Sequence, residues 1–141
     1  MRMLRVSRLS DDLSGVELGT GLLAERRPGQ LTVRVRAAAL NYPDLLMTRG
    51  GYQLKPPLPF VLGMEMAGEV AECDFDSGYR VGDRVVAGTR LGGFADYVLV
   101  EESAVRRVPD SFSFAEAAAF GAAYLTAWVA LVALGRMQAG E

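Results

Sequence analysis

The sequence contains no histidine and only one cysteine, Cys73. Without histidine, the chain cannot build a His-ligated metal site, a His-based catalytic triad or a histidine general base. A single cysteine excludes a disulfide within the chain. A strong net charge is also absent, because 15 Lys and Arg face 17 Asp and Glu, giving a net charge of −2. No basic stripe alternates with aromatic residues, so we expect no nucleic-acid partner.

The length of 141 residues and the 50% hydrophobic composition predict one soluble domain with its own core. The N-terminus lacks the apolar segment of a secretory signal peptide, which favours a cytoplasmic location. One uncharged run, residues 117–134, just reaches the length of a membrane span. Because alanine dominates this run and Gly121, Tyr124 and Thr126 interrupt it, we predict a buried helix of a soluble protein and no membrane partner.

Up to about residue 110, short β-prone runs alternate with glycine and proline, which is typical of a mainly β unit. Gln30–Val35 alternates strictly, with Leu31, Val33 and Val35 on one face of a half-buried strand. A proline at its start and two glycines after its end favour a short helix over Pro43–Arg49. Further strands are predicted at Met64–Val70, Arg84–Ala87 and Phe94–Val100.

The C-terminal part of the chain is predicted to be helical. Ser113 and Glu116 have the spacing of a capping box, so a helix begins there and runs to about Leu134. We expect Gly121 to divide it into two pieces and Gly135 to end it. The helix is apolar nearly all round, so it needs burial by another domain or a second subunit.

Gly19, Gly21 and Ala24 match the relaxed dinucleotide-binding pattern G-x-G-x-x-[GA]. The surrounding sequence does not support a nucleotide site, because Pro28 and Gly29 stop any helix that would present its N-terminus to a phosphate. We therefore predict a strand or hairpin at this motif.

Several segments together resemble the N-terminal half of the medium-chain dehydrogenase/reductase superfamily. The segments are AAALNYPDLLMTRGGY (37–52), VLGMEMAGEVA (61–71), GYRVGDRVVAG (78–88), GGFADYVLV (92–100) and the tail FSFAEAAAFGAAYLTAW (112–128). Within the superfamily the chain is most similar to the zinc-independent quinone oxidoreductases, the zeta-crystallin-like proteins. The resemblance implies a GroES-like irregular β-barrel over residues 1–112 with a short inserted helix. It also implies connecting helices over 113–141 that lead to a Rossmann domain, which this chain lacks.

Two positions depart from the zinc-containing branch of the superfamily. Asn41 and Met64 stand where those alcohol dehydrogenases have a cysteine and a histidine as zinc ligands. An amide and a thioether do not replace thiolate and imidazole on Zn²⁺, and the four-cysteine structural lobe is absent. We therefore predict no metal. Glu65, the neighbour of Met64, is then expected to be either a structural carboxylate or one that supports the residues lining the site, and not a base.

By resemblance, Asn41 is a catalytic and cofactor-binding residue that faces the nicotinamide ribose and the substrate. The alternative is an Asx-type turn that closes the strand before Pro43. Asp44 either orients neighbouring groups or simply suits a helix N-terminus. Thr126 resembles a threonine that approaches the nicotinamide, although a helical threonine often bonds only its own i−4 carbonyl.

Tyr42 and Tyr52 are predicted to bind substrate, because either phenol can hydrogen-bond a quinone oxygen while its ring stacks on the substrate. Tyr52 also resembles the pocket tyrosine of the family and is predicted to be catalytic. Ordinary half-buried packing is the alternative for both residues.

The resemblance implies NADPH-dependent reduction of a quinone or an α,β-unsaturated carbonyl, with a homodimer as the assembly of the longer protein. Reduction of an activated alkene, such as a 2-haloacrylate or an enoyl thioester, is the enzymatic alternative. The second alternative is not an enzyme but a non-catalytic GroES-like interaction module. The sequence leaves open the physiological substrate and the choice between NADPH and NADH. We expect the 141-residue chain to be inactive alone, because the family binds most of NADPH through the other domain.

Overall fold

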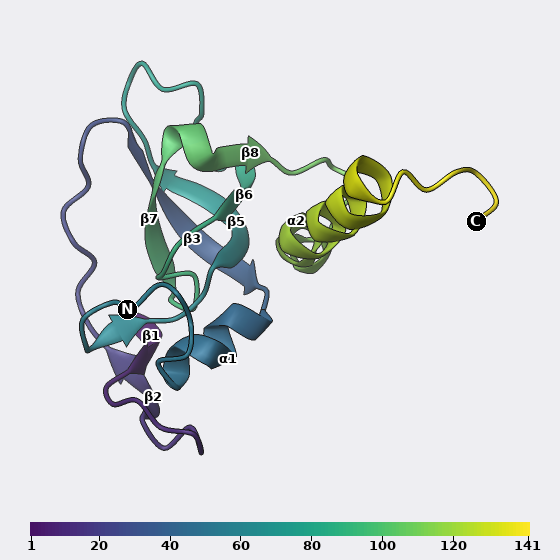
Figure 1. Ribbon diagram of the computed structural model, residues 1–141. Helices are drawn as coiled ribbons and strands as arrows, with labels where there is room; N and C mark the ends of the chain where they lie inside the picture. The colour runs from purple at the N-terminus through teal and green to yellow at the C-terminus, as the bar shows by residue number, and fades with distance from the viewer.

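Two antiparallel sheets form the body of the molecule in the computed structural model, which describes residues 1–141 (Figure 1). The five-stranded sheet has the order β7-β3-β5-β6-β8 and the three-stranded sheet the order β2-β1-β4. A bridge between Met3 and Ala95 links the two sheets. The strands are β1 (Arg2–Val6), β2 (Val16–Thr20), β3 (Gln30–Ala38), β4 (Phe60–Val61), β5 (Glu65–Glu72), β6 (Arg84–Gly88), β7 (Tyr97–Glu101) and β8 (Val105–Arg107).

The centre of the larger sheet carries the main core. Leu31 and Val33 of β3 are fully buried and Arg34 is exposed, as the alternating pattern predicts. Thr32 is buried as well, and its hydroxyl donates a hydrogen bond of 3.0 Å to the Glu72 carboxylate. Register shifts within β3 bend the ladder between β3 and β5, which curves the sheet around its core. The remaining members of this cluster are Met66, Val70, Val85, Ala87, Val98, Val100 and Val105.

A short helix, α1 (Tyr42–Thr48), covers a second core cluster made by Val6, Met47, Phe60 and Leu62. Asn41 is the N-cap residue and Pro43 lies in the first turn, where its missing amide hydrogen costs no helical bond. Gly50 follows the helix with φ of +70°, a conformation that glycine adopts without strain. The helix predicted at 43–49 is therefore confirmed within one residue at each end.

The C-terminal helix, α2 (Phe114–Trp128), begins at the predicted capping box. The Glu116 amide donates to the Ser113 hydroxyl at 3.2 Å, and the Ser113 amide donates to the Glu116 carboxylate at 2.7 Å. A π-helical segment, Val129–Leu134, continues α2 up to Gly135. The predicted break at Gly121 is wrong, because the helix runs through this residue without interruption.

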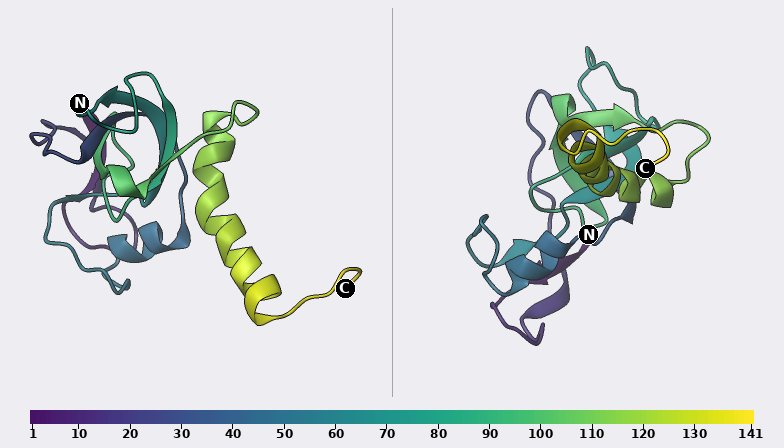
Figure 2. Two further views of the ribbon diagram at one scale, coloured as in Figure 1. Left: turned by 90° about the horizontal axis from the view of Figure 1, so that it is seen from above. Right: turned by 45° about the vertical axis from the view of Figure 1, so that its right-hand side comes forward.

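Helix α2 contacts the sheets through its first half, up to Ala122. Ala117 and Ala118 pack against Ala67 and Val108, and the helix then projects away from the strands (Figure 2). Phe114–Leu134 is long and apolar enough to cross a membrane, and only 11% of its most apolar stretch is buried. That test rests on length and composition alone. Within these 141 residues the helix is not buried, since every residue after Ala118 is exposed apart from half-buried Gly121, and its burial by another domain or a second subunit stays a prediction.

The predicted mainly β fold with one inserted helix is confirmed, although the observed limits of the strands differ from the predicted limits by a few residues. Phe94–Asp96 precede β7 instead of belonging to it, while the remaining predicted strands correspond to β3, β5 and β6. Gly19 and Thr20 of the predicted strand or hairpin are the last residues of β2, whereas Gly21 and Ala24 of the motif lie outside any strand. Strands β1, β4 and β8 were not predicted from the sequence.

Candidate active-site groove

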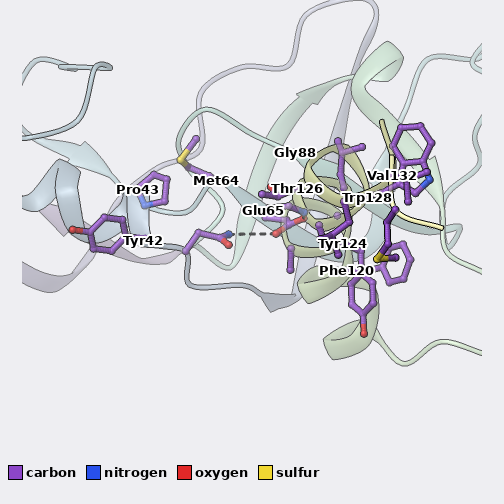
Figure 3. Close-up of a pocket in the computed structure, with 18 residues that line it drawn as sticks. Tyr42, Pro43, Met64, Glu65, Gly88, Phe120, Tyr124, Thr126, Trp128 and Val132 are labelled. Carbon is purple, nitrogen blue, oxygen red and sulfur yellow. Dashed lines mark hydrogen bonds between the residues drawn. The ribbon is translucent and has the colours of Figure 1, made fainter. Parts of the chain in front are cut away.

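An open groove lies between the barrel and one side of α2 (Figure 3). Its volume is about 1160 Å³, and 12 of the 18 residues that line it are hydrophobic. The barrel side consists of the start of α1, the residues that enter β5, and Gly88 at the end of β6. Apolar walls with a few polar groups are the usual composition of a small-molecule site.

Asn41 supplies the first of these polar groups. Its amide nitrogen Nδ2 donates to Glu65 Oε2 at 3.3 Å (Figure 3). Its side chain has the capping-box position towards the Asp44 amide, but that amide donates its hydrogen bond to the Asn41 backbone carbonyl at 3.0 Å and not to the amide oxygen. Asn41 is thus the N-cap residue of α1, and its side chain lines the groove. The amide oxygen is able to accept a hydrogen bond from a ligand.

Glu65 links the barrel to α2. The side chain is 6% exposed, and its second oxygen, Oε1, accepts from the Ala122 backbone amide at 2.7 Å. A Cβ atom on Gly121 would lie 2.4 Å from that oxygen, so only glycine lets the helix come this close. The glycine that was expected to break the helix is thus the point of closest approach between helix and barrel.

Asp44 is the most deeply buried carboxylate near the groove, with 1% exposed. Its oxygens accept from the backbone amides of Asn41 at 2.9 Å and Gly63 at 3.1 Å. The residue does not line the groove. These contacts agree with its interpretation as a helix N-terminal residue, which fixes Asn41 from the backbone side.

Thr126 and Tyr42 both line the groove, on opposite sides of it. The Thr126 hydroxyl makes no hydrogen bond to the protein, so the alternative of a bond to its own i−4 carbonyl is not found here. Tyr42 is 70% exposed and makes no core contact. Both side chains are free to meet a ligand.

Tyr52 lies elsewhere. It is half-buried and packs against the cluster of Val6, Met47, Phe60 and Leu62, and it does not line the groove. The structure therefore brings Asn41, Tyr42 and Thr126 together and leaves Tyr52 apart from them. The position matches the packing alternative for this residue.

An aromatic wall on α2, formed by Phe120, Tyr124 and Trp128, was not predicted from the sequence. The Phe120 and Tyr124 rings are stacked, with centroids 4.5 Å apart and an angle of 11° between planes. Their spacing of four residues places all three on one face of a helix, and that spacing was readable from the sequence. A wall of aromatic rings suits a flat, conjugated ligand.

The carboxyl groups with lowered pKa lie outside the groove. The Gly29 amide and Arg26 lower the pKa of Asp74, and hydrogen bonds from Arg2 lower that of Asp96. These are surface contacts that hold loops in place. Among all 141 residues, no group of three or more His, Cys, Asp and Glu side chains is arranged to hold a metal ion.

Residues 27–110 match the model of the alcohol dehydrogenase GroES-like domain. The chain belongs to this family. The GroES-like domain is 41% identical over 115 residues to the human synaptic vesicle membrane protein VAT-1 homolog, a match that covers 81% of this chain and 29% of that protein. The expected membership of the medium-chain dehydrogenase/reductases is thereby confirmed.

Solved structures agree with this assignment. A probable oxidoreductase from Mycobacterium abscessus superposes with a TM-score of 0.93 at 37% identity, over 100% of this chain and 45% of that one. The quinone oxidoreductase from Thermus thermophilus, described together with its NADPH complex, gives a TM-score of 0.80 at 34% identity, over 94% and 41% of the two chains. The GroES-like domain thus spans less than half the length of these relatives.

Proposed function

We propose that this chain is the substrate-side domain of an NADPH-dependent quinone oxidoreductase that works without zinc. The observation that carries the proposal is the apolar groove in which the Asn41 amide, held by Glu65, shares the lining with Thr126. A relative of 34% identity is described as a quinone oxidoreductase in complex with NADPH, which supports the choice of cofactor. The proposal extends to a cytoplasmic homodimer as the assembly of a longer protein.

The groove fits a nicotinamide and a quinone in its chemistry. The Asn41 amide oxygen, which has the capping-box position but no hydrogen bond, and the Thr126 hydroxyl are able to bind the carboxamide or ribose of the cofactor and orient its ring. When bound, NADPH supplies the hydride. The aromatic wall and Tyr42 offer rings against which a flat acceptor is able to stack.

Two further roles belong to the proposal. Asn41 and Met64, both on the groove, offer an amide and a thioether, which are poor ligands for Zn²⁺, and this supports a reaction without zinc. Tyr52 is proposed to hydrogen-bond the substrate oxygen, although it packs outside the groove in this structure. Tyr52→Phe keeps the ring and its packing, so a loss of quinone turnover in this variant would support that contact.

The test is an Asn41→Ala substitution in the full-length gene product. Loss of a group that orients cofactor and substrate is expected to lower kcat/KM for quinone reduction by about 10- to 100-fold. Gln53→Ala removes an amide from an exposed loop and serves as the control, with activity unchanged. Unaltered turnover and NADPH affinity in Asn41→Ala would remove Asn41 from the site.

A calorimetric titration of the 141-residue chain with NADPH complements this assay. We expect no detectable binding, because in the proposal most cofactor contacts come from another domain. Micromolar binding would mean that the barrel holds a complete cofactor site. Substrate assays with quinones, 2-haloacrylates and enoyl thioesters separate quinone reduction from reduction of activated alkenes.

The exposed face of α2 favours a second candidate, a non-catalytic interaction module. Tyr124, Leu125, Trp128 and Leu131 are each at least half exposed, which is a large apolar surface for a chain of this size. Association through α2, combined with no cofactor binding by the full-length gene product, would favour this candidate over the enzyme.

A further inference from the structure

One carboxylate, Glu65, receives hydrogen bonds from two elements that are far apart in the sequence. Oε2 accepts from the Asn41 side chain at the start of α1, and Oε1 accepts from the Ala122 backbone in the middle of α2. Glu65 is only 6% exposed, so water does not compete freely for either oxygen. The proposed function uses the contact between Glu65 and Asn41 but does not say what it does to the orientation of the Asn41 amide.

The two groups that donate to Glu65 differ in whether they can turn from donor to acceptor. A backbone amide such as that of Ala122 only donates, and an ionised carboxylate only accepts. The Asn41 side chain is the adjustable partner, because a primary amide turned by 180° exchanges its oxygen and nitrogen with little change in shape. With a carboxylate oxygen as its neighbour, Asn41 has to present its nitrogen there.

We propose that Glu65 is a positioning residue that fixes which end of the Asn41 amide faces the groove, and ties that orientation to the position of α2. With Nδ2 held by Glu65, the amide oxygen remains for a ligand. Asn41 then favours ligand groups that donate a hydrogen bond, such as a carboxamide NH₂ or a hydroxyl. This consequence for the ligand rests on the proposed function, whereas the orientation itself does not.

Glu65→Gln makes the orientation testable without removing the side chain. Glutamine has one acceptor and one donor end. The Ala122 amide binds the glutamine oxygen, so the glutamine NH₂ faces Asn41, and the Asn41 amide turns over to accept. The variant should keep the fold and reverse the polarity of Asn41.

Asn41 is the only asparagine in the chain, so labelling with ¹⁵N-asparagine gives a single side-chain NH₂ signal pair in an NMR spectrum. In the 141-residue chain we expect one proton of this pair far downfield, as for a hydrogen bond to a carboxylate. In Glu65→Gln it should move to the position of a solvated amide. Glu69→Gln is the matched control, since Glu69 lies on the same strand but pairs with Arg36 at the surface. An unchanged pair in Glu65→Gln would overturn the proposal.

A second test exchanges the two side-chain groups, so that the carboxylate stands at position 41 and the amide at position 65, and measures the stability of the fold. Asn41→Asp sets two carboxylates against each other and should raise the unfolding equilibrium constant by about tenfold or more at neutral pH. Asp and Asn are equally good N-cap residues, so the loss reports the contact with Glu65. In the double variant, which combines Asn41→Asp with Glu65→Gln, the glutamine NH₂ donates to the new carboxylate and should recover most of the loss.

Effects that simply add in the double variant would overturn the proposal, because two side chains that do not hold each other through this hydrogen bond give no such rescue. These measurements use the chain without cofactor or substrate. Failure of the NMR and exchange experiments therefore removes the role of Glu65, while failure of the quinone assay removes the proposed function and leaves the orientation intact.

Discussion

Three residues near the start of α1, namely Asn41, Asp44 and Glu65, are joined by hydrogen bonds beside the groove. Asp44 holds the Asn41 backbone, and Glu65 holds the Asn41 side chain. Both carboxylates are buried, and both accept from N–H donors through each of their oxygens. Because charge-assisted hydrogen bonds are the strong ones and unsatisfied buried groups are costly, Asn41 is held on two sides.

Asp44→Asn is expected to destabilise the fold. One of the two amides at Asn41 and Gly63 would then face an NH₂ group instead of an oxygen. A buried donor without a partner costs about 1–3 kcal/mol of unfolding free energy. Urea denaturation followed by circular dichroism measures the loss. The control is Asp110→Asn in an exposed loop, and equal midpoints for the two variants would contradict the proposed role of Asp44.

Helix α2 is defined at its start by local chemistry and in its middle by a tertiary contact. The capping box of Ser113 and Glu116 uses only neighbouring residues. The hydrogen bond between Ala122 and Glu65, beside Gly121, joins positions 57 residues apart in the chain. The helix therefore forms by its own sequence and is located by the barrel.

Gly121→Ala should destabilise the protein although alanine is the better helix former. An added Cβ would meet Glu65 Oε1 at 2.4 Å and push the carboxylate from its partners. We expect a net loss of about 1–3 kcal/mol, as for overpacking in a core. Ala119→Gly at an exposed site of the same helix serves for comparison and should cost about 1 kcal/mol. A more stable Gly121→Ala variant would rule out the close approach.

The capping box also predicts a dependence on pH. Hydrogen bonds from Ser113 lower the pKa of Glu116 below its usual value of 4.5, so the folded state favours the ionised carboxylate. This stabilisation is complete above that usual value and is lost as the pH falls through the lowered pKa. The difference in urea midpoint between the natural chain and Glu116→Gln should shrink between about pH 6 and about pH 3.

Glu25→Gln is the control for this experiment, because Glu25 is exposed and makes no side-chain hydrogen bond. Its midpoint should follow that of the natural chain at every pH. A difference for Glu116→Gln that stays constant across the range would mean that the capping box contributes nothing through its charge.

The molecule as a whole is asymmetric, with a well-packed barrel on one side and an uncovered helix on the other (Figure 2). The core clusters belong to the sheets, α1 and the first turns of α2. Leu125 and Leu134 have no such environment and are 63% and 76% exposed. An apolar surface of this kind is typical of an interaction site.

We expect the 141-residue chain to associate as its concentration rises. Exposed leucines on α2 provide the driving force through burial of apolar area. Leu125→Lys combined with Leu134→Lys should shift sedimentation profiles towards the monomer. Leu18→Lys, which alters an equally exposed leucine on β2, should leave association unchanged. A monomer at all concentrations for the natural chain would contradict this expectation.

The parts of the fold that depend on local patterns were predictable from the sequence. Alternation located β3, proline and glycine bounded α1, and the Ser113 and Glu116 pair located the start of α2. Short edge strands such as β4 and β8 were not found, because two or three residues carry no measurable period and pair only through tertiary contacts.

The site was predictable to a similar degree. The family resemblance predicts Asn41 and Thr126 as site residues and the chemistry of the phenol predicts Tyr42, and all three line one groove. The role of Gly121 was misjudged, because helix propensity says nothing about a carboxylate that arrives from another strand. Tyr52 was placed by analogy, and packing under α1 holds it away from the other candidates.

The attachment of α2 near its beginning turns the rest of the helix into a lever. From Ala122 to Leu134 the rise per residue gives an arm of about 18 Å, and a tilt of about 10° at the attachment would move its tip by about 3 Å. Every residue of the aromatic wall after Ala122 moves with this arm. The width of the groove therefore depends on the contact of Glu65 with Gly121 and Ala122, together with the packing of Ala117 and Ala118, because these contacts hold the arm against the barrel.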